Sequence, residues 1–210
     1  MRTRTYGVIY ADPPWCYRDK RRGRGGAEDH YGTMDLEDIK AIRVPAADDC
    51  ALFLWATCPL LPQAFDVIDA WGFTYRTVGF AWTKLNPTGV GLSVGLGYWT
   101  RSNTEVCLLA VRGRPRPVSH RVHSVVISPR RRHSEKPDEV RERIVALMGN
   151  VPRLEMFVRT REPGWDAFGN EVAGPITVER RLVGPLTHVP VRPRGRREVA
   201  ESRGRRCSNA

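Results

Sequence analysis

The sequence predicts an α/β fold built on a largely parallel sheet. Residues 6–11 and 51–56 are short, continuous apolar runs, as expected for strands that are covered on both faces. Residues 60–71 and 136–148 instead repeat apolar side chains with the 3.6-residue period of a helix. Because strands and helices alternate along the chain, the sheet should be mainly parallel and flanked by helices.

The first strand leads directly into a rigid loop. Residues 6–11 (YGVIYA) end at Asp12 and two prolines, which cannot continue a hydrogen-bonded ladder. Residues 18–26 combine charge with glycine and are predicted to be a mobile loop. A short helical pattern then begins at Met34 and runs to about Ile42.

The middle of the chain predicts a strand, a helix and two further strands. Residues 51–56 (ALFLWA) form a candidate central strand. The helix that follows ends before Gly72, which occupies the position of a left-handed C-terminal residue. Residues 74–83 alternate like a strand, a glycine-rich loop covers 86–97, and residues 105–111 (EVCLLAV) form another strand.

The last part of the domain begins with residues 112–133, a stretch rich in Arg, Pro, Ser and His that we expect to be a loop leaving the sheet near its catalytic end. A helix at about 136–148 has Pro137 in its first turn and an apolar face that ends before Gly149. Residues 153–158 predict a strand, and residues 164–171 a structured turn.

Size and charge predict one domain with a basic tail. The 210 residues, 41% of them hydrophobic, suffice for one core of ordinary size. The formal net charge is +11, but the stretch from Ala173 onward holds nine arginines against three glutamates and accounts for more than half of it. We therefore predict a catalytic domain over 1–172 and a disordered tail over 173–210, which either binds a polyanion or is simply solvated.

The five cysteines are odd in number and contain no CxxC pair, so neither a disulfide framework nor a zinc site is predicted, and no metal is expected. The start of the chain has no apolar signal core, and no apolar run approaches the roughly 18 residues that span a bilayer. These observations predict a soluble, cytoplasmic protein without a membrane partner.

The tetrapeptide Asp12-Pro13-Pro14-Trp15 carries the strongest chemical signal. A literal DPPW arises by chance in on the order of a few per ten thousand chains of this length. It also follows the first predicted strand, where ligands bind in open α/β sheets. The alternative is a proline-rich turn that merely ends a strand.

These residue types suit the methylation of a planar amine, which is a poor nucleophile because its lone pair is delocalised. The Asp12 carboxylate and the Pro13 carbonyl can accept the two amine hydrogens, turn the lone pair toward a methyl donor and stabilise the developing positive charge. The prolines hold that carbonyl in place, and Trp15 offers a face for a base taken out of its stack.

Together with these residues, several ordered blocks resemble the MT-A70 family of adenine-N6 methyltransferases. The similarity covers about residues 6–172. The blocks are HYGTM at 30–34, LFLWAT at 52–57, WGF at 71–73, WTK at 82–84, GLGYW at 95–99, EVCL at 105–108, HSEKPDE at 133–139, RLEMF at 153–157 and the turn at 164–171.

The resemblance implies a Rossmann-like, class I methyltransferase that uses S-adenosylmethionine. Its catalytic residues would be Asp12, Pro13, Pro14 and Trp15. Asp12, Lys136, Phe157, Arg159, Asn170 and Glu171 would bind the cofactor. Tyr31, Lys84, Asn86 and Trp99 would bind the substrate, whereas Trp55, Trp71 and Trp82 are assigned to the core.

One departure from the family concerns the cofactor adenine. Some members contact it with an acidic residue well upstream of DPPW, whereas only eleven residues precede Asp12 here. Asp12, nearby backbone or residues 157–162 would have to recognise the adenine instead.

The predicted substrate is adenine in DNA, in a bacterial or phage-infected cell. Three basic stretches, residues 18–24, 112–132 and the tail, are candidates for phosphate contacts, which carry no base identity, and the alternative for each is a solvated surface. Residues 112–132 are the best candidate for sequence specificity. Adenine in RNA is the second choice, and cytosine N4 or protein glutamine are further planar targets. A non-catalytic nucleic-acid-binding partner with the same fold is the alternative from another class.

Overall fold

The chain folds around a seven-stranded sheet in a computed structural model. The structure describes residues 4–16, 33–95, 97, 99–131, 135–158 and 160–169. Its elements are β1 (Tyr6–Ala11), α1 (Leu36–Lys40), β2 (Ala46–Ala56), the 3₁₀ turn η2 (Cys58–Leu60), α2 (Leu61–Ala70), β3 (Thr74–Leu85), β4 (Thr104–Arg112), β5 (Val125–Pro129), α3 (Asp138–Met148), β6 (Arg153–Met156) and β7 (Asp166–Phe168). The loop predicted at 18–26 and the predicted tail at 173–210 lie outside the described residues.

The sheet has the order β5-β3-β4-β2-β1-β6-β7. β1 pairs in parallel with β2 and with β6, β6 with β7, and β3 with β5. β4 is antiparallel to both of its neighbours, β2 and β3. The sheet is therefore mixed, and the α/β class is confirmed with one reversed strand in the middle.

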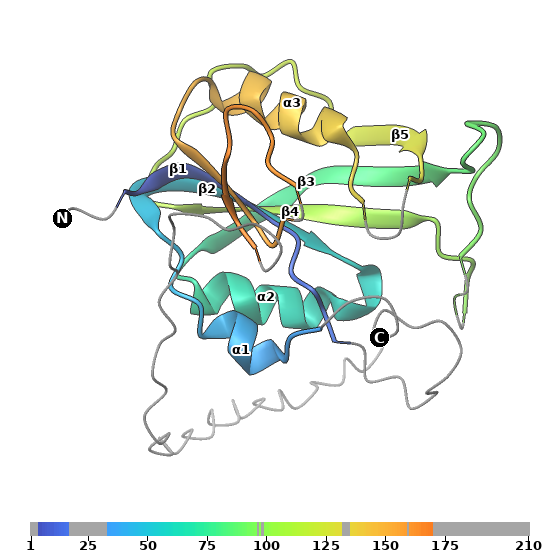
Figure 1. Cartoon of the computed structure of the whole chain (residues 1–210), viewed down its shortest axis with the longest axis horizontal. Helices are drawn as coiled ribbons and strands as arrows, with labels where there is room; N and C mark the ends of the chain where they lie inside the picture. The colour runs from blue at the N-terminus through green and yellow to red at the C-terminus, as the bar shows by residue number, and fades with distance from the viewer. Residues whose placement is uncertain are drawn as a thin grey trace, which may run out of the picture.

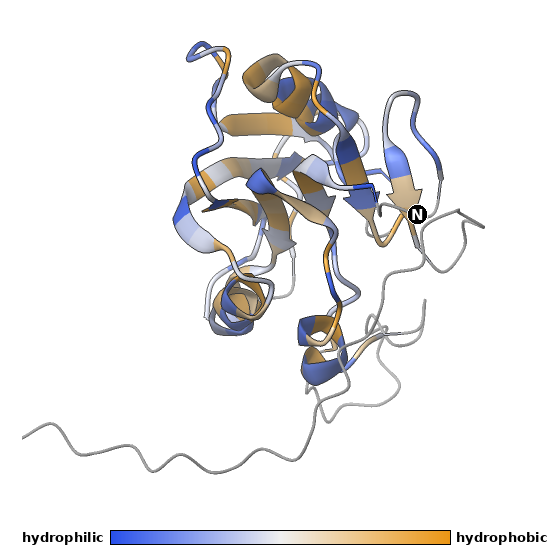
Figure 2. Ribbon diagram, turned by 90° about the vertical axis from the view of Figure 1, so that its left-hand side faces the viewer, coloured by the Kyte–Doolittle hydropathy of each residue, from blue (hydrophilic) through white to orange (hydrophobic). Residues whose placement is uncertain are grey.

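Helices cover both faces of this sheet. Figure 1 shows α3 over one face and α1 with α2 over the other, so the domain has three layers. The helices are coloured orange and blue along their lengths, as expected for amphipathic elements, while much of the sheet is orange (Figure 2). Among the described residues, no helix is long and apolar enough to cross a membrane.

The continuous apolar run of β2 fills two cores at once. Leu52 and Leu54 face the core on the α2 side, whereas Phe53 and Trp55 face the core on the α3 side. Since successive strand residues point to opposite faces, a strand between two helical layers needs apolar residues throughout. The prediction of a central strand at 51–56 is confirmed, and the strand extends back to Ala46.

The predicted helices are also present. α2 buries Ala64, Val67 and Ile68 against the sheet, and Gly72 follows with a φ of 76°, as its sequence position predicted. α3 buries Val140 and Ile144, and Asp138 lies in its first turn. Pro137 is the residue before the helix rather than part of its first turn.

Two strands were not predicted. β5 lies inside the stretch interpreted as a loop, and β7 inside the segment interpreted as a turn. β5 forms an edge of the sheet, where Val126 is buried while Val125 and Ile127 are exposed. Such a short edge strand, flanked by Arg, Pro and His, gives a weak apolar signal in the sequence.

The reversed strand also moves the basic loop. β4 ends at Arg112, which pairs with Cys50 at the end of the sheet opposite Asp12. β5 starts at Val125, which pairs with Ala81 and is therefore level with Ala56, at the same end of the sheet as Asp12. Within this stretch, the Val118 amide donates a hydrogen bond to the Leu147 carbonyl near the end of α3 (2.8 Å). The prediction that residues 112–132 leave the sheet near its catalytic end is therefore wrong for the point of departure at Arg112, although the stretch returns to the catalytic end at β5.

Candidate active site

The site lies where β1 ends, at what we call the catalytic edge. The Asp12 amide donates to the Met156 carbonyl (3.5 Å), so the residues after β1 and β6 are neighbours. β4 runs the other way, and its second residue, Glu105, pairs with Trp82 near the end of β3. The reversal of β4 thus brings an acidic side chain from its beginning to the edge where the parallel strands finish.

The catalytic loop after β1 is fastened through its backbone. The Trp15 amide donates to the Pro13 carbonyl (2.8 Å), and the Met34 amide donates to the Pro14 carbonyl (2.9 Å). A carbonyl oxygen has two lone pairs, so Pro13 retains the capacity to accept a second hydrogen. Backbone hydrogen bonds therefore hold the carbonyls of Pro13 and Pro14, and the role predicted for the Pro13 carbonyl stays a prediction.

Trp15 has a different position from the one expected. It is 8% exposed and packs into the core on the α2 side, and its indole N–H donates to the Trp55 carbonyl (3.1 Å). The interpretation of Trp15 as an open face for a base is therefore corrected. Its large apolar ring is buried and holds the end of the loop on β2.

Four side chains of alternating charge cross the catalytic edge. The Lys136 ammonium lies 2.6 Å from Asp12 Oδ2 and 3.5 Å from Glu105 Oε2. The other carboxylate oxygen of Glu105 binds Lys84. We call Asp12, Lys136, Glu105 and Lys84 the charge line. It unites residues predicted separately as catalytic, cofactor-binding and substrate-binding.

Glu105 was not predicted as a site residue, although it belongs to one of the family-like blocks. Its side chain is 17% exposed. Burial by itself would raise the pKa of Glu105, but Lys136 and Lys84 together bring that pKa below its usual value. The carboxylate is thus charged at neutral pH. The direction of β4, which no local pattern reveals, decides that it lies between the two lysines.

The remaining cofactor predictions fall at the ends of β6 and β7. Phe157, the residue after β6, has a φ of 66°, which is a strained value for a bulky side chain. Its amide and that of Val158 both donate to the Phe168 carbonyl. A Cβ on Gly169 would lie 2.2 Å from the Val158 carbonyl, so this close approach requires glycine. Arg159, Asn170 and Glu171 lie outside the described residues.

The predicted substrate residues are not all gathered together. Lys84 joins the charge line. The Asn86 side chain donates to the Val90 carbonyl (3.1 Å) and closes the turn after β3. Trp99 is 99% exposed in the loop between β3 and β4. Tyr31 lies outside the described residues.

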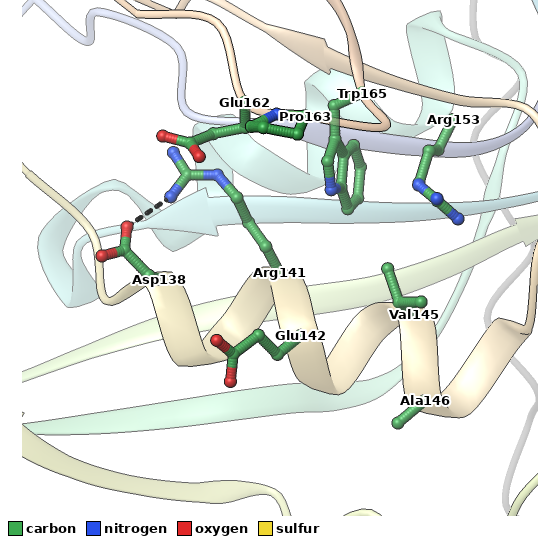
Figure 3. Close-up of a pocket in the computed structure, with 9 residues that line it drawn as sticks. All are labelled: Asp138, Arg141, Glu142, Val145, Ala146, Arg153, Glu162, Pro163 and Trp165. Atoms are coloured by element: carbon green, nitrogen blue, oxygen red, sulfur yellow. Dashed lines mark hydrogen bonds and ion pairs between the residues drawn. The ribbon is translucent and has the colours of Figure 1, made fainter.

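A cavity of about 520 Å³ lies along α3 and not over Asp12. Figure 3 shows Arg141 extending from α3 toward Asp138 and Glu162, with Trp165 standing beside it. Arg141 binds Asp138 (2.8 Å) and the buried Glu155 (2.7 Å), so its charge is already paired. We therefore place neither substrate nor cofactor in this cavity. No group of three or more His, Cys, Asp or Glu that would hold a metal occurs in the described part of the chain.

The three tryptophans assigned to the core are buried, with 1% exposure for Trp55 and 3% for Trp71 and Trp82. Trp71 donates its indole N–H to the Ile39 carbonyl, away from the catalytic edge. Trp55 and Trp82 are different, because each also lies under a lysine of the charge line. The core assignment is confirmed for all three and is incomplete for these two.

Comparisons with known proteins agree with this geometry. The MT-A70 family model matches residues 6–171. The Type II methyltransferase M.MunI of Mycoplasma sp is 34% identical over 80% of this chain and 78% of its own length. The human N(6)-adenosine-methyltransferase catalytic subunit METTL3 is 29% identical over 80% of this chain and 28% of its own length. An Arabidopsis thaliana N(6)-adenosine-methyltransferase MT-A70-like protein is 29% identical over 81% of this chain and 24% of its own length, so the chain spans about a quarter of these longer relatives. The chain therefore belongs to the MT-A70 family of methyltransferases.

Proposed function

We propose that this protein transfers a methyl group from S-adenosylmethionine to the N6 amine of adenine in DNA, within a Rossmann-like, class I fold. The observation that carries the proposal is the pair of acceptors at the catalytic edge. Asp12 and Pro13 are consecutive residues on a loop held by hydrogen bonds from the Trp15 indole to Trp55, from the Trp15 amide to Pro13 and from the Met34 amide to Pro14.

The chain's own residues prepare the amine for reaction. Asp12 and Pro13 accept its two hydrogens, which turns the nitrogen lone pair away from the ring. As the nitrogen becomes positive, the Asp12 carboxylate stabilises that charge. Lys136 stays bound to Asp12 during this step, because a carboxylate accepts several hydrogen bonds at once.

The described residues fit the cofactor in charge. S-adenosylmethionine supplies the methyl group from its sulfonium, and its amino-acid end carries a carboxylate and an ammonium. Lys136 would bind the carboxylate, and Asp12 would receive the ammonium or the base amine. Phe157 lies beside Asp12 at the end of β6, where it would pack against the adenosine.

DNA is favoured as the substrate by the pattern of similarity. M.MunI, a Type II methyltransferase, is matched over most of both chains. The N(6)-adenosine-methyltransferases are matched over a quarter of their length, which supports adenine N6 as the target atom. Adenine in RNA is the second candidate, because these longer relatives are named for adenosine.

The decisive experiment incubates the purified full chain and methyl-labelled S-adenosylmethionine with unmethylated plasmid DNA and with an RNA transcript of it. After digestion, mass spectrometry identifies the methylated nucleoside. We expect N6-methyladenine from DNA. Oligonucleotides in which inosine, which lacks the amine, replaces adenine should accept no methyl group.

Other outcomes would replace the proposal. A faster reaction with RNA would favour the second candidate, and N4-methylcytosine would contradict adenine as the target. If no substrate is methylated and calorimetry also finds no cofactor binding, the chain is not an enzyme of this class. A non-catalytic nucleic-acid-binding partner would then be the better description.

A further inference from the structure

Trp55 contacts both sides of the catalytic residue. Its backbone carbonyl accepts the Trp15 indole N–H (3.1 Å), and its own indole N–H donates to the Tyr10 hydroxyl (2.7 Å). Tyr10 and Trp15 flank Asp12 in the sequence. The ring of Trp55 also lies 5.5 Å from the Lys136 ammonium. One residue thus links the strand before Asp12 and the lysine bound to it through its side chain, and the loop after Asp12 through its backbone.

Tyr10 is a firm anchor for this indole. It is 2% exposed, and its ring packs 5.8 Å from Trp165 and 5.9 Å from the Arg141 guanidinium. Burial raises the pKa of Tyr10 well above its usual value, so the phenol remains neutral. A neutral hydroxyl accepts the Trp55 N–H at any physiological pH.

Lys136 is the group that most needs this support. Its side chain is 10% exposed, so water contributes little to holding the ammonium. Its ammonium binds the carboxylates of Asp12, just after β1, and Glu105 on β4. Burial raises the pKa of the Cys107 thiol, which is near enough to Asp12 and Lys136 to sense both charges. When Asp12 also accepts hydrogens from a bound ligand, the indole face adds to the attraction that holds the Lys136 ammonium in place.

A second indole repeats the arrangement. The Lys84 ammonium lies 4.8 Å from the Trp82 ring, and Trp82 meets Trp55 edge to face at 6.3 Å. Each of the two lysines of the charge line therefore lies against an indole ring, and the two indoles contact each other. Trp71 is similarly buried, and within the described part of the chain no cation lies over its ring, so it provides a matched control.

We propose that Trp55 is a positioning residue of the methyl-transfer reaction. Its indole ring holds the Lys136 ammonium in the position in which it binds Asp12. This inference rests on the proposed function for its kinetic part and on the geometry alone for its structural part. It predicts that an aromatic ring at position 55 matters for Lys136 beyond its contribution to the core.

The geometric test uses the small number of lysines. The chain has four, Lys20, Lys40, Lys84 and Lys136, so selective carbon-13 labelling of lysine gives few NMR signals, which Lys84→Arg and Lys136→Arg variants assign. The ring current of Trp55 should displace the Lys136 side-chain proton signals upfield. Trp55→Leu should remove that displacement, and Trp71→Leu should leave it unchanged.

The kinetic test compares cofactor binding with turnover. Because Lys136 is assigned to the cofactor carboxylate, Trp55→Leu should raise the cofactor dissociation constant and KM about tenfold while kcat changes less than threefold. Trp55→Phe should restore most of the affinity, because it keeps an aromatic face. Trp71→Leu should lower the unfolding temperature without changing the dissociation constant of the folded protein.

Three outcomes would overturn the inference: an unshifted Lys136 signal in the wild type, Leu and Phe equivalent at position 55, or equal affinity losses in the Trp55 and Trp71 variants. If the wild type methylates nothing, the proposed function fails, whereas the NMR comparison still decides whether Trp55 holds Lys136.

Discussion

Asp12 is the residue to which the proposed function assigns the chemistry, and it is already bound to a cation. The Lys136 ammonium, 2.6 Å away, stabilises the negative charge of the Asp12 carboxylate. In the proposed reaction, this carboxylate would bind the amine as its lone pair turns away from the ring. The sequence predicted both residues but not their contact, because 124 positions separate them. Because Asp12 is assigned to the base and Lys136 to the cofactor, we expect one ion pair to take part in binding both ligands.

Asp12→Ala should abolish methyl transfer, with a loss of at least about 100-fold, because it removes the carboxylate that orients and stabilises the amine. Cofactor affinity should stay within a few-fold, since Lys136 still has Glu105 beside it. Labelled transfer and calorimetry measure the two effects. Asp69→Ala, on the exposed side of α2, is the control. Equal loss of cofactor affinity would assign Asp12 to the cofactor.

Glu105→Gln should destabilise the protein at neutral pH by about 2–3 kcal/mol, because two partly buried lysines lose their shared anion. The pKa of Glu105 is lowered on folding, so its stabilisation is present above the unfolded value of about 4.5 and is lost as pH falls below it. Urea unfolding between about pH 3 and 7 measures the difference.

The variant should therefore show a smaller loss of stability below about pH 4.5 than the wild type. Glu37→Gln is the control. It removes the ion pair between the exposed Glu37 and Lys40 on α1 and should change stability by less than about 1 kcal/mol. Parallel acid profiles for the wild type and Glu105→Gln would show that the lysines do not depend on Glu105.

At the scale of elements, β4 and α3 assemble the site. β4 brings Glu105 to the catalytic edge by running against its neighbours, and the segment before α3 brings Lys136. α3 is held by its apolar face and by one buried ion pair. Arg141 donates three hydrogen bonds to Glu155 of β6, at 2.7–3.0 Å.

Arg141→Met should destabilise the protein by about 3–5 kcal/mol, because Glu155, 6% exposed, would lose its partner. Burial raises the pKa of Glu155 and Arg141 opposes that shift, so the carboxylate depends on Arg141 for its charge. Chemical unfolding of Arg141→Met, Glu155→Met and the double variant forms a thermodynamic cycle.

The double variant should regain much of the loss, since methionines can fill the same space. Arg131→Met is the control. It removes the exposed ion pair between Arg131 and Asp138 at the start of α3 and should lower stability by less than about 1 kcal/mol. Additive losses in the cycle would contradict a buried, coupled pair.

At the scale of the whole molecule, the first and last described strands are tied together. The Tyr6 hydroxyl donates to Asp166 Oδ2 (2.8 Å) across 160 positions, and Arg4 binds the same oxygen (2.8 Å). Burial, aided by the Asp166 hydrogen bond and charge, raises the pKa of Tyr6 to about 12. The contact joins β1, which begins the sheet in sequence, to β7 at its edge.

Tyr6→Phe should lower stability by about 1–2 kcal/mol at pH 8, because Asp166 loses a hydrogen bond. The pKa of Tyr6 rises from about 10 to about 12 on folding, so this contribution is complete below pH 10 and is lost as pH rises through 12. The variant should therefore lose less stability than the wild type over that range in urea unfolding.

Tyr10, whose pKa burial also raises, is present in both proteins, so the difference isolates Tyr6. Tyr75→Phe, a change on the exposed side of β3, is the control for the loss of a tyrosine hydroxyl. An identical profile for Tyr6→Phe and the wild type would refute the role of this hydrogen bond.

Local patterns predicted those parts of the fold that depend on neighbours in the chain. The apolar runs of β1 and β2, the 3.6 period of α2 and α3 and the left-handed Gly72 all follow from short-range backbone preferences. β5 was not predicted from the sequence, because an edge strand needs few apolar residues. Of the candidate site, Asp12 and Lys136 were predicted, while Glu105, Trp55 and the burial of Trp15 were not.

The sequence by itself determined the α/β class, the rigid DPPW loop after a buried strand and the family. Those features rest on residue types and spacings within a few turns of chain. The tertiary structure alone decided that β4 runs antiparallel to its neighbours and that Glu105 therefore joins two lysines at the catalytic edge. It also decided that the chain after β4 leaves the sheet at the opposite end and that the rings of two tryptophans lie against those lysines. Strand direction and side-chain proximity across the sheet arise from packing two helical layers on one sheet, and such long-range contacts leave no mark in a local pattern.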